Sequence, residues 1–121
     1  MPGGSKYEGS REKLAQYTAV VERSESDAEV QGAKNPYTSR NGHMFSFLAP
    51  DGVMALRLSE ELGEQFRVEY DSGPVVQYGS VMRGYVSVPA ELLAKPGELT
   101  PWFDEAWDWI GSLPAKPTKK N

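Results

Sequence analysis

The first residue to test for chemistry is the only histidine, because imidazole serves both as a general base and as a metal ligand. This residue is His43, which directly follows the dipeptide Asn41-Gly42. A zinc site needs three or four ligands, and the 121 residues contain no cysteine that could complete one. As a general base, His43 would need an orienting partner that the sequence does not identify. We therefore interpret His43 as a polar residue that opens a strand.

The sequence contains neither a nucleophile elbow nor a phosphate-binding loop motif. No Gly-Xaa-Ser-Xaa-Gly nucleophile elbow occurs. The segment 79–84, Gly-Ser-Val-Met-Arg-Gly, contains two glycines but lacks the Lys-Ser/Thr ending of a phosphate loop. It also connects two predicted strands, whereas a phosphate loop leads from a strand into a helix. We interpret this segment as a connecting loop.

Pairs of acidic residues have structural explanations. Glu60 and Glu61 begin a predicted helix, where the helix dipole favours negative charge. Asp104 and Asp108 lie four residues apart on a predicted helix and could share a divalent ion, but the solvated face of the helix is the better explanation for them. We predict no catalytic, cofactor-binding or metal-binding residue and no enzyme activity.

All three tryptophans fall on one predicted helix near the end of the chain. Thr100 is its expected N-cap and Pro101 its expected first residue. At about 100° per residue, its apolar side chains occupy one broad arc. They are Trp102, Phe103, Ala106, Trp107, Trp109, Ile110 and Leu113. This arc is expected to pack on a sheet; the alternative is that Trp102 or Trp109, at its edge, stays exposed for a partner.

Two turn motifs predict the strands in the first half of the chain. Asn41-Gly42 suits a two-residue hairpin, which needs positive φ at both positions. Pro50-Asp51-Gly52 suits a second tight turn. Together they predict antiparallel strands at about 37–40, 43–48 and 53–58. A helix that Ser10 caps and that ends by Ser24 should precede them.

The second half of the chain completes the predicted fold. Ser59 should cap a short helix that presents Leu62 and Phe66 on one face. Strands follow at 75–79 and 84–88, and residues 89–93 form one helical turn. The main element order is α-β-β-β-α-β-β-α. This order predicts an α+β fold, with an antiparallel sheet on which the helices pack.

Charge and composition limit the classes of partner that the protein is expected to bind. The formal net charge is −4, and residues up to Leu113 carry ten basic against 17 acidic side chains, a net charge of −7. We expect one domain over 1–113 and a disordered basic tail over 114–121 that includes Lys116, Lys119 and Lys120. An acidic domain disfavours nucleic acid. No apolar run is long enough to span a membrane, and no secretory signal is present, so we expect a cytoplasmic protein.

Four segments together resemble the TfoX N-terminal domain family. They are NGHMFSFL at 41–48, DGVMALRL at 51–58, GYVSVPAELL at 84–93, and the Trp-bearing helix with SLPAKP at 112–117. The resemblance covers about residues 7–117 and implies a stand-alone domain of a helix, three strands, a helix, two strands and a helix. The family is linked by name to a regulator of natural competence, and it supplies no catalytic residues to transfer.

These observations lead to two hypotheses for function. The first is a non-enzymatic interaction or regulatory module that binds a protein partner or itself, through the Trp-bearing helix or through free sheet edges. The alternative is a small apolar ligand-binding domain, in which the aromatic helix and a face formed by Phe45 and Phe47 line the pocket.

Overall fold

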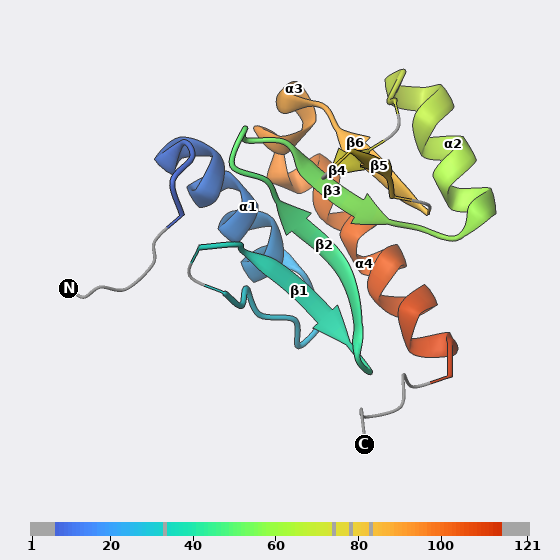
Figure 1. The fold of residues 1–121 in the computed structure, drawn as a ribbon. Coiled ribbons are helices and arrows are strands. Elements are labelled where there is room, and N and C mark those ends of the chain that lie inside the picture. Colours follow the sequence, from blue (N-terminus) through green and yellow to red (C-terminus); the bar gives the residue numbers. More distant parts are fainter. Residues whose placement is uncertain (1–6, 33, 74, 78, 83, 115–121) are drawn as a thin grey trace.

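The computed structural model describes residues 7–32, 34–73, 75–77, 79–82 and 84–114, and it has an α+β fold (Figure 1). The elements are α1 (Arg11–Arg23), β1 (Tyr37–Arg40), β2 (His43–Leu48), β3 (Met54–Arg57), α2 (Glu60–Tyr70), β4 (Val76–Gln77), β5 (Ser80–Val81), β6 (Tyr85–Val88), α3 (Ala90–Leu93) and α4 (Pro96–Ser112). The predicted fold class is confirmed. Lys116, Lys119 and Lys120 of the predicted basic tail lie outside the described residues.

The main sheet has four antiparallel strands in the order β1-β2-β3-β6. Helices α1 and α4 pack against each other and cover one face of this sheet (Figure 1). The main core lies between them and the sheet, and its largest side chains include Tyr17, Phe45 and Phe103, all fully buried. Helix α2 packs beside the edge strand β6.

The predicted caps at Ser10 and Ser59 and the two predicted turns are confirmed. The Ser10 and Ser59 hydroxyls accept hydrogen bonds from backbone amides in the first turns of α1 and α2. Asn41 and Gly42 both have positive φ, at 55° and 83°, as their two-residue hairpin requires. At the second turn, the Asp51 carboxylate accepts a hydrogen bond from the amide of Val53.

The start of the last helix was predicted five residues too late. Helix α4 begins at Pro96, so Pro101 lies inside it. Pro96 suits the first position because a helix leaves the amides of its first turn unpaired. Thr100 does not cap the helix; its hydroxyl donates to the Val20 carbonyl oxygen on α1 at 3.4 Å. The extra turn lets Leu99 and Thr100 be buried against the rest of the chain.

The predicted strand at 75–79 is not part of the main sheet. Only Val76 and Gln77 form β4, which pairs with β5 in a separate two-stranded hairpin. Val75, just before β4, and Met82, just after β5, pack on the sheet face opposite the helices. The hairpin therefore partly covers this second face, which we call the outer face.

A β-bulge divides the side chains of β2 between the two faces. Thr38 pairs with Ser46 and Ser39 with Met44, so Phe45 has no partner of its own in β1. Phe45 packs on α4, with 5.2 Å between its ring centroid and that of Phe103. Phe47 lies on the outer face, 5.5 Å from the Tyr85 ring. The expectation that Phe45 and Phe47 share a face is therefore wrong.

Both edges of the main sheet are closed at one position each. On β1, Tyr37 exchanges two backbone hydrogen bonds with Gln31, at 2.8 and 2.9 Å. On β6, the carbonyl oxygen of Ser87 accepts a hydrogen bond from the Ser72 hydroxyl at 2.5 Å. Each of the edges that were expected to be free is therefore partly covered.

Candidate binding site

The hydrogen-bond partner of His43 among the described residues is the backbone at the end of the described chain. His43 lies half-buried at the start of β2, with Nε2 2.8 Å from the carbonyl oxygen of Pro114. Because a carbonyl oxygen can only accept, the imidazole donates this hydrogen bond. The contact supports the interpretation of His43 as a structural polar residue.

Three buried hydroxyls meet where α1 crosses the sheet. The Ser46 oxygen lies 2.6 Å from the Tyr17 hydroxyl and 2.5 Å from the Thr38 hydroxyl. All three residues are fully buried, and burial raises the pKa of Tyr17 well above its usual value. A serine nucleophile needs a base and a path for substrate, and these hydroxyls offer neither. The cluster therefore ties α1 to β1 and β2; no sequence motif pointed to it.

The acidic residues singled out in the sequence do not converge. Asp104 accepts a hydrogen bond from the Ser24 hydroxyl, and Asp108 is exposed. Within the described ranges, no three His, Cys, Asp or Glu side chains lie close enough together to hold a metal ion. In the segment 79–84, Gly79 and Gly84 have the positive φ of turn residues, and Arg83 lies outside the described residues.

The three tryptophans are half-buried and engaged within the chain. Trp102 stacks edge-on against Phe66, with 5.1 Å between ring centroids, and its indole N–H donates to the Tyr70 hydroxyl. Trp107 packs under the Arg40 guanidinium, whose Cζ is 4.3 Å from the ring centroid. Trp109 lies under Arg57 at 5.4 Å. None of the three stands free as an anchor, although each keeps some exposed surface.

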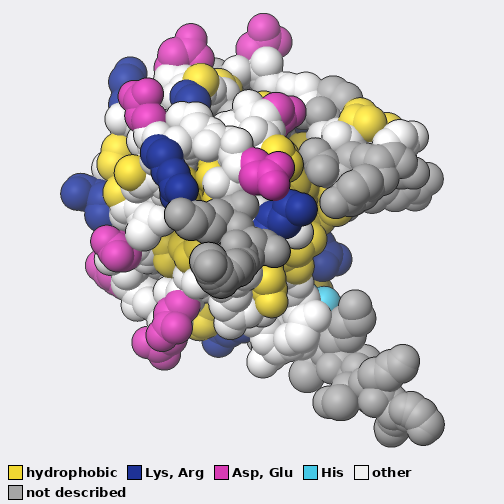
Figure 2. All heavy atoms as spheres, turned by 60° about the vertical axis from the view of Figure 1, so that its left-hand side comes forward, with side chains coloured by type: hydrophobic (Ala, Val, Ile, Leu, Met, Phe, Trp, Pro, Cys, Tyr) yellow, Lys and Arg dark blue, Asp and Glu magenta, His cyan; other side chains and the backbone are white. Residues whose placement is uncertain are grey.

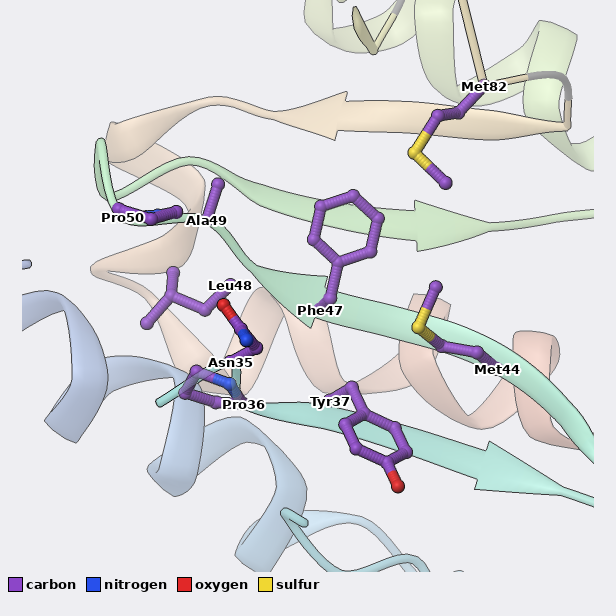
Figure 3. Close-up of a pocket in the computed structure, with 9 residues that line it drawn as sticks. All are labelled: Asn35, Pro36, Tyr37, Met44, Phe47, Leu48, Ala49, Pro50 and Met82. Carbon is purple, nitrogen blue, oxygen red and sulfur yellow. The ribbon is translucent and has the colours of Figure 1, made fainter. Parts of the chain in front are cut away.

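A concave apolar surface lies on the outer face of the sheet, between β1, β2 and the turn after β2 (Figure 3). We call it the outer pocket. It has a volume of about 260 Å³ and is lined by Asn35, Pro36, Tyr37, Met44, Phe47, Leu48, Ala49, Pro50 and Met82. Eight of these nine side chains are apolar or aromatic, and the amide of Asn35 is the exception.

Figure 3 shows how these side chains are arranged: Phe47 stands near the centre, and Met82, which reaches in from beyond β3, and Met44 on β2 lie on the same side of it in this view. Tyr37 extends from β1 at the margin. The bulge creates this arrangement, because it turns Met44 and Phe47 to the outer face while Phe45 enters the core. The sequence showed the apolar residues but not the face that they occupy.

Electrostatically, the outer pocket is neutral. None of its lining residues carries a formal charge. Tyr85 supports its floor by packing on Phe47 and by donating a hydrogen bond to the Met44 carbonyl oxygen at 2.7 Å. Burial raises the pKa of Tyr85 to about 12, so its hydroxyl keeps its proton near neutral pH. The pocket is therefore suited to apolar groups and not to ions.

Two further findings concern membrane-spanning helices and similarity to known proteins. Among the helices of the described residues, none combines the length and the apolar character needed to cross a membrane. Comparison of the chain with models of protein families, with curated proteins and with solved structures gave no match.

Proposed function

We propose that the protein is a non-enzymatic interaction module, similar to the TfoX N-terminal domain, that holds an apolar side chain of a protein partner in the outer pocket. The pocket itself is the observation that supports this proposal. It is a concave surface on which eight of the nine lining side chains are apolar or aromatic. A cytoplasmic location is part of the same proposal.

The size and flexibility of the outer pocket favour a side chain as its occupant. Its volume of about 260 Å³ lies below the range of roughly 300–1,000 Å³ that is usual for small-molecule sites. Met44 and Met82 lie beside Phe47, and unbranched thioether side chains adapt readily to an incoming group. The exposed Asn35 amide at the margin offers a donor and an acceptor to a partner backbone.

Charge favours a different protein over a second copy of this chain or a nucleic acid. The residues up to Leu113 carry a net charge of −7, so two copies repel each other and a basic partner is attracted. In the face that Figure 2 shows, acidic and basic side chains are interspersed, without the basic stripe of a nucleic-acid interface. A basic protein with an exposed apolar side chain is therefore the partner class we propose.

Affinity capture with matched variants tests this proposal. The Phe47→Ser protein loses the centre of the outer pocket, whereas Val68→Ser removes an apolar side chain on α2 that is 79% exposed and lies outside the pocket. We expect the wild type and Val68→Ser to retain the same partner and Phe47→Ser to release it. Thermal unfolding of each variant checks that the fold is intact. Equal retention by all three proteins would rule out the outer pocket as the interface.

Methionine methyl NMR then locates the contact. Met44 and Met82 line the outer pocket, whereas Met54 is fully buried in the main core. On adding the captured partner, we expect the methyl signals of Met44 and Met82 to shift and that of Met54 to stay in place. Light scattering measures whether the chain dimerises, and a dimer that Phe47→Ser dissociates would identify a second copy as the partner instead.

A small apolar ligand is the second candidate occupant, because eight of the nine lining residues are apolar or aromatic. This candidate now belongs to the outer pocket, since Phe45 faces the core. A ligand that binds the native state raises the melting temperature by mass action. A metabolite screen that finds a stabiliser of the wild type without effect on Phe47→Ser would favour this candidate over a protein side chain.

A further inference from the structure

A second hollow, away from the outer pocket, lies where the chain leaves β3 and enters α2. It has a volume of about 440 Å³, and its lining includes Arg57, Arg67, Glu60 and Trp109. We call it the arginine hollow. Its volume falls within the usual range for small-molecule sites, unlike that of the outer pocket.

Arg57 is held at the arginine hollow by an aromatic ring and a glycine. Its guanidinium carbon lies 5.4 Å from the centroid of the Trp109 ring. Its Cγ and Nε lie 3.7 Å from the position that a Cβ on Gly84 would occupy. Gly84 has a φ of 85°, a conformation that other residues rarely adopt. The Arg57 side chain therefore runs along bare backbone to a ring that orients its planar head group.

Arg67 lines the same hollow from helix α2. Its Nη1 lies 3.5 Å from the position of a Cβ on Gly63, one helical turn earlier. Gly63 therefore leaves open the space against which the Arg67 guanidinium lies. Two guanidinium groups from separate elements thus line one hollow, although the protein as a whole has a net charge of −4.

Neither guanidinium group donates a hydrogen bond to another residue that the structure describes. Among the described arginines, Arg40 alone donates a side-chain hydrogen bond to another described residue, the Trp107 carbonyl oxygen. Glu60 is the one carboxylate in the lining of the arginine hollow. Two positive charges and one negative charge leave a net charge of +1, which matches a singly charged anion better than a doubly charged one.

We propose that the arginine hollow binds the carboxylate group of a small molecule. Guanidinium groups bind planar carboxylates through paired hydrogen bonds, and Trp109 holds one of them in a fixed orientation. Such a ligand binds independently of the apolar side chain proposed for the outer pocket, because the two hollows share no lining residue.

NMR titration of the full-length chain with sodium acetate tests this proposal. The reporters are the Trp109 indole N–H and the Nε–H signals of Arg57 and Arg67. We expect saturable shifts with acetate and none with sodium chloride at the same ionic strength. Replacing Arg57 or Arg67 with glutamine should weaken acetate binding roughly tenfold, since each change removes charge-assisted hydrogen bonds. Equal shifts with chloride would overturn the proposal.

Two further variants separate binding from folding. Arg11→Gln removes an exposed arginine outside the hollow, and it should bind acetate as the wild type does. Glu60→Gln removes the opposing charge, and it should bind acetate a few-fold more tightly, an effect that loss of structure would not produce. Unchanged affinity in the Arg57→Gln and Arg67→Gln proteins would overturn the proposal. Inorganic phosphate that binds more than tenfold more tightly than acetate would overturn the choice of a carboxylate.

Discussion

Substituting each of the two phenylalanines of β2 with alanine tests the bulge on which the outer pocket depends. Phe45 is fully buried, and the centroid of its ring lies 5.2 Å from that of Phe103 and 6.0 Å from that of Trp107. A large-to-small change at such a site lowers the free energy of unfolding by about 3–5 kcal/mol. Phe47 is half-buried and has one aromatic neighbour. Because its burial is partial, we expect Phe47→Ala to cost about 1–2 kcal/mol.

Urea denaturation measures both changes. Far-UV circular dichroism is the better signal, because Trp107 touches Phe45 and its fluorescence would respond to the substitution directly. The slope of unfolding free energy against urea should stay constant across the variants, so that midpoints compare stabilities. If Phe45→Ala does not fold, Phe45→Leu should still cost about 1–1.5 kcal/mol. Equal losses at the two sites within about 0.5 kcal/mol would contradict their placement on opposite faces.

Three further predictions concern stability. Gly63→Ala should stabilise the protein by about 0.5–1 kcal/mol in urea denaturation, because alanine favours a helix and the added Cβ would meet its neighbours at 3.5–3.9 Å, ordinary contact distances. Gly111→Ala should destabilise it by about 1 kcal/mol, because the Cβ would come within 2.3 Å of Arg40 Nη1 and displace Arg40 from Trp107; a gain like that of Gly63→Ala would disprove this. The raised pKa of Tyr85 means that its proton stabilises the fold fully below pH 10, and that this contribution, on the order of 2 kcal/mol, is lost as the pH rises toward 12. Between pH 10 and 12, the melting temperature should decrease less steeply with pH for Tyr85→Phe than for the wild type. An equal decrease in the two proteins would contradict the raised pKa of Tyr85.

Elements with strictly local causes were predictable from the sequence. The hairpin at Asn41-Gly42 follows from a backbone requirement that lies within the two residues themselves. The starts of α1 and α2 follow from a serine that bonds an amide three residues later. In both cases the interacting groups are so close in sequence that the rest of the chain cannot change the outcome.

The start of α4 and the strand at 75–79 were harder to predict from the sequence, because in each case the local residues are compatible with two different structures. Pro96 and Pro101 both suit a first helical position, and the choice depends on whether Leu99 and Thr100 can be buried. That burial depends on α1, including Val20, whose carbonyl oxygen lies 80 residues away in sequence from Thr100. Val75 and Val76 have strand-forming side chains, but strand β3 already pairs with β6.

The local amino-acid sequence thus determines the helices, the turns and the α+β class, since caps and turn conformations involve residues that are neighbours along the chain. The face on which each apolar side chain of β2 lies was decided by tertiary contacts. Ser46 is drawn inward by the hydroxyl of Tyr17, 29 residues away, and the bulge that accommodates it turns Phe47 outward. Simple alternation along a strand assigns Phe45 and Phe47 to one face. A buried hydroxyl must find its partner wherever the fold places one, and this requirement formed the outer pocket.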